Sequence, residues 1–188
     1  MKKFTFIILS SLFLLTACED TSLDPFKLAD ITKASIIALR GEAVDNLNDR
    51  TYLGSVDRFS KSGDLNAESF SFDADFLSDD LNSLVQVDIY ARVSESDPRK
   101  PLATVSGSEF KTGSGRYPRA SISIPLTTIL STLGVNAADL PTNSYLFIES
   151  DLTLTDGTVV PASAIVNSSL FESAIFYPAH NLRYLVTE

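Results

Sequence analysis

The chain carries few side chains that could do chemistry, and its only histidine is the most obvious of them. His180 could act as the base of a Ser-His-Asp arrangement, because serine and aspartate are plentiful. The sequence holds no Gly-x-Ser-x-Gly elbow, however, and one histidine alone cannot build a multi-histidine zinc site. We therefore expect His180 to be exposed or partly packed beside Pro178. We predict no catalytic residue, no metal site and no enzyme activity.

Carboxylates form the second candidate, since glycosidases need only two of them. Four aspartates lie close together at positions 73, 75, 79 and 80. Strand alternation places Asp73 and Asp75 on a solvated face, and Asp79 and Asp80 follow in a turn. The segment lacks the glycine and the distal glutamate of an EF-hand loop. We expect a wet strand face running into a polar turn, with calcium disfavoured and no cofactor.

The third candidate is the loop at residues 111–119, which combines mobile glycines with three cations and one aromatic ring in an otherwise acidic chain. Loops on a rigid sandwich commonly carry recognition, so Arg116, Tyr117 and Arg119 are the candidate ligand-binding residues. A solubilising hairpin loop is the alternative interpretation. The chain has no tryptophan, which counts against a surface that stacks on sugars.

The only cysteine, Cys18, follows a leader-like segment. Met1-Lys2-Lys3 supplies a positive start, residues 4–15 form an apolar run, and small residues precede the cysteine. This is the pattern of a secretory signal peptide, which we place at residues 1–17. The apolar run is too short to cross a bilayer, because a spanning helix takes roughly 20 apolar residues.

The stretch Leu15-Thr-Ala-Cys18 resembles the bacterial lipobox, in which the cysteine after the cut receives lipid and becomes the mature N-terminus. The resemblance implies that Cys18 carries a diacylglyceryl group. No thiol would then remain for a disulfide, a metal or a nucleophile. Two or more acyl chains hold a protein stably where one is marginal, so we expect firm attachment to a membrane through this N-terminal lipid.

Charge disfavours two classes of partner. Residues 1–17 hold Lys2 and Lys3 and no acid, so their removal leaves 13 basic and 24 acidic residues and a formal net charge of −11. Nucleic acid is not expected as a partner, because binding it needs clustered lysine and arginine. An anionic membrane surface does not attract such a chain either, so we expect the lipid to attach the protein to the membrane.

Behind the leader we expect a tether and one domain. Residues 18–31 show no periodicity and carry several aspartates, which predicts an acidic flexible tether with a reach of about 20 Å. The domain at 32–188 is long enough for one core without disulfides. Apolar and polar residues alternate at 68–76, 84–93, 120–124 and 145–155, and shorter strand signals lie at 33–39, 102–105, 158–165, 170–177 and 182–186. At 84–93 the alternation predicts Val85 on the buried face.

The pattern of elements predicts the fold class. Apolar residues spaced i, i+3, i+4 and i+7 indicate one short helix near 126–133, with Pro125 at its first position and Gly134 as its cap. Asp156-Gly157 indicates a tight hairpin turn. Seven or more short strands with one helical connection predict an all-β fold, an antiparallel β-sandwich like those of immunoglobulin or fibronectin-III domains. A small barrel is the alternative.

The acids that follow the cysteine, in Cys18-Glu19-Asp20 and then Asp24, resemble lipoproteins of Bacteroidetes-type bacteria. Three features of the C-terminal half resemble small lipoproteins that accompany starch-utilisation-type (Sus-like) importers: Val85-Gln-Val-Asp-Ile-Tyr90, the helix at 126–133, and Leu152-Thr-Leu-Thr-Asp-Gly157. The resemblance implies a non-enzymatic, immunoglobulin-like accessory lipoprotein at the outer membrane, facing the cell exterior. Its partners would be TonB-dependent transporter subunits or other surface lipoproteins. Cys18 is the one functional residue that the resemblance carries over.

Two other functions remain open at this point. A surface lipoprotein could bind glycans or peptides through the loop at 111–119. A β-sandwich lipoprotein could also be a pilus or adhesin-like subunit that assembles by strand addition.

Overall fold

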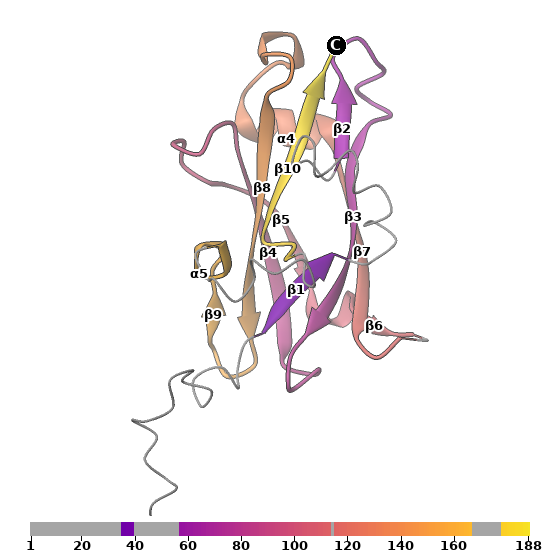
Figure 1. The fold of residues 1–188 in the computed structure, drawn as a ribbon, viewed down its shortest axis with the longest axis vertical. Helices are drawn as coiled ribbons and strands as arrows, with labels where there is room; N and C mark the ends of the chain where they lie inside the picture. Colours follow the sequence, from indigo (N-terminus) through magenta and orange to yellow (C-terminus); the bar gives the residue numbers. More distant parts are fainter. Residues whose placement is uncertain (1–34, 40–56, 114, 167–177) are drawn as a thin grey trace, which may run out of the picture. The chain divides into compact units, whose positions relative to one another are not determined.

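The computed structural model describes residues 35–39, 57–113, 115–166 and 178–188, and every element named below lies in these ranges (Figure 1). The expected signal peptide at 1–17, the expected tether at 18–31 and Cys18 itself lie outside the described residues. So does the strand expected at 170–177. In the described part of the chain, no helix is long and apolar enough to cross a membrane.

The first sheet holds four strands, and all its neighbouring pairs are antiparallel. Their order is β1 (Ile36–Leu39), β3 (Ser69–Leu77), β7 (Pro118–Pro125) and β6 (Lys111–Thr112). The alternation predicted at 68–76 and at 120–124 is confirmed, because every second residue of β3 and β7 is buried. Phe72 lies opposite Ile122, which lines up the apolar faces of the two strands.

The second sheet is larger and contains the one parallel pair among the described strands. Its order is β2 (Asp57–Ser60), β10 (Asn181–Thr187), β8 (Tyr145–Leu154), β4 (Leu84–Arg92) and β5 (Lys100–Ser106), and β9 (Val159–Val160) pairs with β8 off this path. β2 runs parallel to β10, whereas the other pairs are antiparallel. The strands expected at 145–155 and 182–186 are confirmed here as β8 and β10.

The strand orders confirm the predicted all-β sandwich and match an immunoglobulin domain. The order β1-β3-β7-β6 corresponds to strands A-B-E-D, and β10-β8-β4-β5 corresponds to G-F-C-C′ of the variable type. The first two strands belong to different sheets, since β1 pairs antiparallel with β3 and β2 pairs parallel with β10.

The core lies between the two sheets and is built by side chains from both. Phe59 of β2 and Phe70 of β3 each place a ring centroid 5.0 Å from that of Tyr184 of β10. Burying one such large side chain stabilises the fold by about 1.5–3 kcal/mol. This ring cluster therefore joins the sheets in a chain that has no cysteine pair for the inter-sheet disulfide of antibody domains.

One short helix connects the sheets at the predicted position. α4 (Leu126–Leu133) follows β7 and buries its four apolar residues against the core. It ends at Gly134, whose φ of 72° is left-handed and whose N–H donates to the Leu130 carbonyl oxygen at 2.8 Å. Pro125 is the N-cap rather than the first helical residue. Two 3-10 turns also occur, η3 (Gly107–Glu109) between β5 and β6 and η4 (Ala137–Asp139) between α4 and β8.

The buried face predicted for β4 is wrong at its first position. Val85 is 43% exposed instead of buried. The register between β4 and β8 shifts between Leu84 and Gln86, so the regular alternation of buried residues starts at Val87. A β-bulge of this kind adds one residue to a strand and turns the side chains before it to the other face.

The strand predicted at 158–165 is wrong in its second half. The hairpin turn forms as expected, with Gly157 at a φ of 83°, but β9 ends at Val160. The short helix α5 (Ala162–Val166) follows. Pro161 stands between them; it lacks the N–H that would continue the strand ladder, and proline suits the entry to a helix.

Candidate functional site

The expected recognition loop is a β-hairpin formed by β6 and β7. Lys111 and Thr112 of β6 pair with Arg119 and Pro118 of β7, so Arg119 belongs to the sheet. Arg119 Nε lies 2.8 Å from Asp75 Oδ1 on the neighbouring strand. Arg116 and Tyr117 do lie in the connection, with the guanidinium of Arg116 5.3 Å from the centroid of the Tyr117 ring. The connection between the two strands therefore presents Arg116 and Tyr117 of the three residues expected, while Arg119 is part of the sheet.

The four clustered aspartates lie on β3 and in the turn that follows it. Asp73 and Asp75 are half-buried on β3, opposite its apolar residues. Asp79 accepts the Asp80 backbone N–H at 2.9 Å, and Asp80 accepts the Asn82 N–H at 3.0 Å, as in turns closed by aspartate. Within the described ranges, no group of three or more His, Cys, Asp or Glu residues could hold a metal ion.

His180 is fully buried, which corrects the expectation of an exposed or partly packed residue. Its Nε2 accepts the Ile37 backbone N–H at 3.1 Å, and its Nδ1 lies 2.8 Å from the Ser150 carbonyl oxygen. These partners assign a neutral ring with the proton on Nδ1. Burial lowers the pKa of His180 from 6.5 to about 4, against the opposing effects of the Ser150 carbonyl and the Asp151 charge.

The position of His180 gives it a structural role. Ile37 belongs to β1 of the first sheet and Ser150 to β8 of the second, so the imidazole joins the backbones of both sheets. The chain around it repeats this link: the Ala179 N–H donates to the Ile37 carbonyl at 2.8 Å, and the Ser150 N–H donates to the His180 carbonyl at 3.1 Å. With both ring nitrogens bonded to backbone, no nitrogen is left to accept a proton from a nucleophile.

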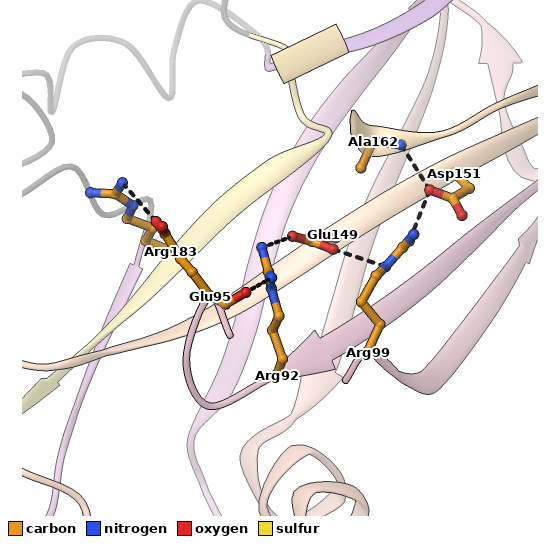
Figure 2. A network of polar contacts seen from close by, with 7 residues as sticks. All are labelled: Arg92, Glu95, Arg99, Glu149, Asp151, Ala162 and Arg183. Atoms are coloured by element: carbon orange, nitrogen blue, oxygen red, sulfur yellow. Dashed lines mark hydrogen bonds and ion pairs between the residues drawn. The ribbon is translucent and has the colours of Figure 1, made fainter. Parts of the chain in front are cut away.

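A polar cluster that sequence reasoning missed lies on the outer face of the second sheet (Figure 2). We call it the arginine network; it comprises Arg92, Arg99, Arg183, Glu95, Glu149 and Asp151. Glu149 of β8 is its centre, because it is buried and binds both Arg92 and Arg99. The Glu149–Arg99 ion pair measures 2.8 Å from Oε2 to Nε.

The network extends from Glu149 in two directions, as Figure 2 shows. Asp151 accepts from Arg99 Nη2 at 2.8 Å and from the Ala162 backbone N–H at 2.8 Å, which ties the start of α5 to β8. On the other side, Arg183 of β10 lies 4.0 Å from the Glu95 carboxylate. The cluster thus connects β10, β8, the end of β4 and the turn before β5.

Each arginine of the network also lies over an aromatic ring. Arg99 is 4.0 Å from the centroid of Tyr90, Arg92 is 5.5 Å from that of Phe147, and Arg183 is 5.4 Å from that of Tyr145. Such cation–π contacts contribute about 0.5–1 kcal/mol each at exposed sites. The guanidiniums of Arg92 and Arg99 therefore each contact both an aromatic ring and the Glu149 carboxylate.

The strand register explains why this cluster forms. Tyr90 pairs with Glu149 and Arg92 with Phe147, so outward residues of β4 and β8 meet as cross-strand neighbours. The alternation within each strand was visible in the sequence, with Tyr90 and Arg92 on one wet face and Glu149 and Asp151 on another. The pairing of the two faces was not, because the alternation within a strand does not fix its register against another strand.

Two small pockets adjoin the network. The first has a volume of about 210 Å³ and lies between Arg92, Asp97, Lys100 and the end of α4 at Leu133. Lys100 Nζ donates to the Leu133 carbonyl oxygen at 2.8 Å and thereby caps the helix. The second, of about 250 Å³, lies over β4 and β5 beside Asp88 and Tyr90.

The sequence was compared with known protein families and with curated proteins. No protein-family model matches the chain, and no curated protein matches it.

Proposed function

We propose that this chain is a lipid-anchored, non-enzymatic accessory protein of the outer membrane, whose immunoglobulin-like domain docks on subunits of a TonB-dependent nutrient importer. The observation that carries the proposal is Cys18: it is the only cysteine, and it follows a positive start, an apolar run and small residues. The acidic charge of the rest of the chain leaves the lipid as the means of attachment.

The engagement of the polar side chains supports a role other than catalysis. Both ring nitrogens of His180 are hydrogen-bonded to backbone groups. Glu149 and Asp151 are bound by arginines. General acid–base catalysis needs a group within reach of a substrate proton, whereas these groups serve the fold.

The arginine network supports docking through the outer face of the second sheet. Arginine and aromatic residues are enriched in protein interfaces, and rigid side chains lose little entropy when a partner binds. Arg183, whose side chain is 40% exposed, is the most accessible of the three arginines of the network. The assignment of the partner as an importer rests on the resemblance around Cys18 and in the C-terminal half.

Membrane fractionation tests the anchor. The full chain, produced in a bacterium that processes lipoproteins, should sediment with outer membranes, and Cys18→Ala should move it to the soluble fraction. Proteolysis of intact cells should digest the anchored protein if it faces the exterior. Retention of Cys18→Ala in the membrane would remove the basis of the proposal.

Cross-linking in the bacterium that encodes the protein tests docking. Capture through a tag added after Glu188 should recover importer subunits with the native chain. Arg183→Glu should abolish this recovery, and Arg116→Glu in the β6–β7 hairpin is the matched control that should preserve it. Recovery of no importer subunit by the anchored native chain would contradict the partner assignment.

A further inference from the structure

The larger of the two pockets lies beside a β-bulge between β4 and β5. Ile89 pairs with Ala103, but the next residue, Tyr90, pairs with Pro101, so Leu102 is an extra residue on β5. Bulges re-aim side chains and are frequent next to binding sites. Here the extra residue is part of the wall of a pocket of about 250 Å³ that β4 and β5 line together.

The polar wall of this pocket is arranged around Asp88. Gln86 Nε2 donates to both carboxylate oxygens, at 3.0 and 2.8 Å, and Thr104 Oγ1 donates to Oδ1 at 2.8 Å. A carboxylate has about four acceptor positions, so Asp88 retains capacity for donors from a ligand. Because Thr104 gives its proton to Asp88, its oxygen offers lone pairs as well. A ligand with several hydroxyl groups satisfies this wall best.

The charges around the pocket favour a neutral ligand. An anion would face the Asp88 carboxylate. A cation would be repelled by the nearby guanidinium of Arg99, which does not line the pocket but lies 4.0 Å from the centroid of the Tyr90 ring, where Glu149 and Asp151 bind it. The remaining wall is apolar and comes from Pro101 and Leu102.

The geometry points to the Asp88–Tyr90–Thr104 pocket as a binding site for one neutral, polyhydroxylated ring, the chemistry of a single sugar unit. Asp88 and Thr104 receive the hydroxyl groups, while Tyr90, Pro101 and Leu102 contact the apolar face of the ring. The site goes beyond the docking role proposed above, and it lies in the sheet opposite to the β6–β7 hairpin. At about 250 Å³ the pocket is smaller than the roughly 300–1,000 Å³ of drug-sized sites, so it has room for one ring.

Ligand-observed NMR with defined sugars tests the site. The full chain is purified as the cell processes it and kept in a zwitterionic detergent without a sugar headgroup. The probes are the methyl glycosides of glucose, galactose, mannose and N-acetylglucosamine, with methyl glucuronide as the anionic analogue. We expect saturable binding of at least one neutral probe and at least tenfold weaker binding of the glucuronide.

Matched variants locate the binding. Asp88→Asn and Tyr90→Leu should each weaken the affinity at least tenfold, whereas Asp73→Asn on β3 and Tyr117→Leu in the hairpin should leave it unchanged. Thermal unfolding verifies that each variant is folded, and Thr104→Val replaces any variant that is not. Absence of saturable binding by every neutral probe, or affinity unchanged in the folded pocket variants, would overturn the inference. Neither result bears on the membrane anchor, which fractionation of Cys18→Ala tests separately.

Discussion

The imidazole of His180 accepts the backbone N–H of Ile37 at 3.1 Å, across the interface between the two sheets. The acceptor must be an unprotonated nitrogen, because an imidazolium presents only donors. The bond between these residues therefore exists only while His180 is neutral, so this one link between β1 and the second sheet depends on pH.

This dependence predicts a specific loss of stability in acid. Above pH 6.5 His180 is neutral in both the folded and unfolded states. As the pH falls from 6.5 to 4, His180 becomes protonated in the unfolded chain but stays neutral in the folded chain, because burial lowers its pKa in the folded state to about 4. At about 1.4 kcal/mol per pKa unit, the free energy of unfolding should fall by about 3 kcal/mol over this range and lose nothing further from this group below it.

Urea unfolding at intervals between pH 7.5 and pH 4 measures this effect. The control is His180→Gln, which carries no titrating ring but keeps hydrogen-bonding capacity. Carboxylates contribute equally to both proteins, so the difference in unfolding free energy between native chain and variant should shrink as the pH falls. A difference that stays constant over the whole range would show that His180 is not held neutral.

Glu149 predicts a second measurable effect, because its removal leaves Arg92 and Arg99 partly buried without their shared carboxylate. The side chains of the two arginines are 18% and 30% exposed, so water recovers part of the loss. We expect Glu149→Ala to cost about 2–3 kcal/mol in unfolding free energy, below the 3–5 kcal/mol of a fully buried pair.

Glu95→Ala is the matched control for the network. The Glu95 side chain is 68% exposed and reaches Arg183 only at 4.0 Å. Exposed pairs of this kind contribute about 0–1 kcal/mol, so the variant should unfold close to the native denaturant midpoint. Equal losses for the two glutamate variants would mean that Glu149 is not the centre of the network.

Alanine substitutions at two glycines test how closely η3 approaches β4. A Cβ on Gly107 would lie 2.0 Å from the Leu84 carbonyl oxygen, which is backbone and cannot rotate away. A Cβ on Gly113 would meet nothing within 4 Å. Thermal unfolding should show Gly107→Ala destabilised by at least about 1–3 kcal/mol, the usual cost of overpacking, while Gly113→Ala stays near the native value. Similar melting temperatures for both would contradict the close approach of η3 to β4.

The β-bulge at the start of β4 can be tested in the same way. Val85 is 43% exposed and Val87 is fully buried, although simple alternation puts both on one face. Val87→Ala should cost about 2 kcal/mol through lost burial and a cavity, and Val85→Ala should cost less than about 0.5 kcal/mol. Comparable losses of unfolding free energy from both substitutions would mean that Val85 is buried like Val87, and would contradict the β-bulge.

Local patterns predicted the sandwich because its strands bury one face. Alternation identified β3, β7 and β8, and the spacing of apolar residues with Gly134 identified α4. The features that the sequence did not predict, the burial of His180 and the arginine network, depend on long-range strand pairing. Nothing near His180 indicates that β1 and β8 lie on either side of it. The arginine network needs the register of β4 against β8, and Arg99 lies in a segment that reads only as a turn. At Pro161 the lost N–H outweighed the β-rich residues around it.

Mass spectrometry of the N-terminal peptide, from protein extracted from membranes, tests the lipid anchor most directly. The proposal predicts a chain that begins at Cys18 and carries the added mass of a diacylglyceryl group on that residue. Residues 1–17 should be missing, and Cys18→Ala should give neither the cut nor the added mass. A mature chain that retains Met1, or one that contains Cys18 as an unmodified thiol, would contradict the anchor and with it the proposed place of this domain at the membrane.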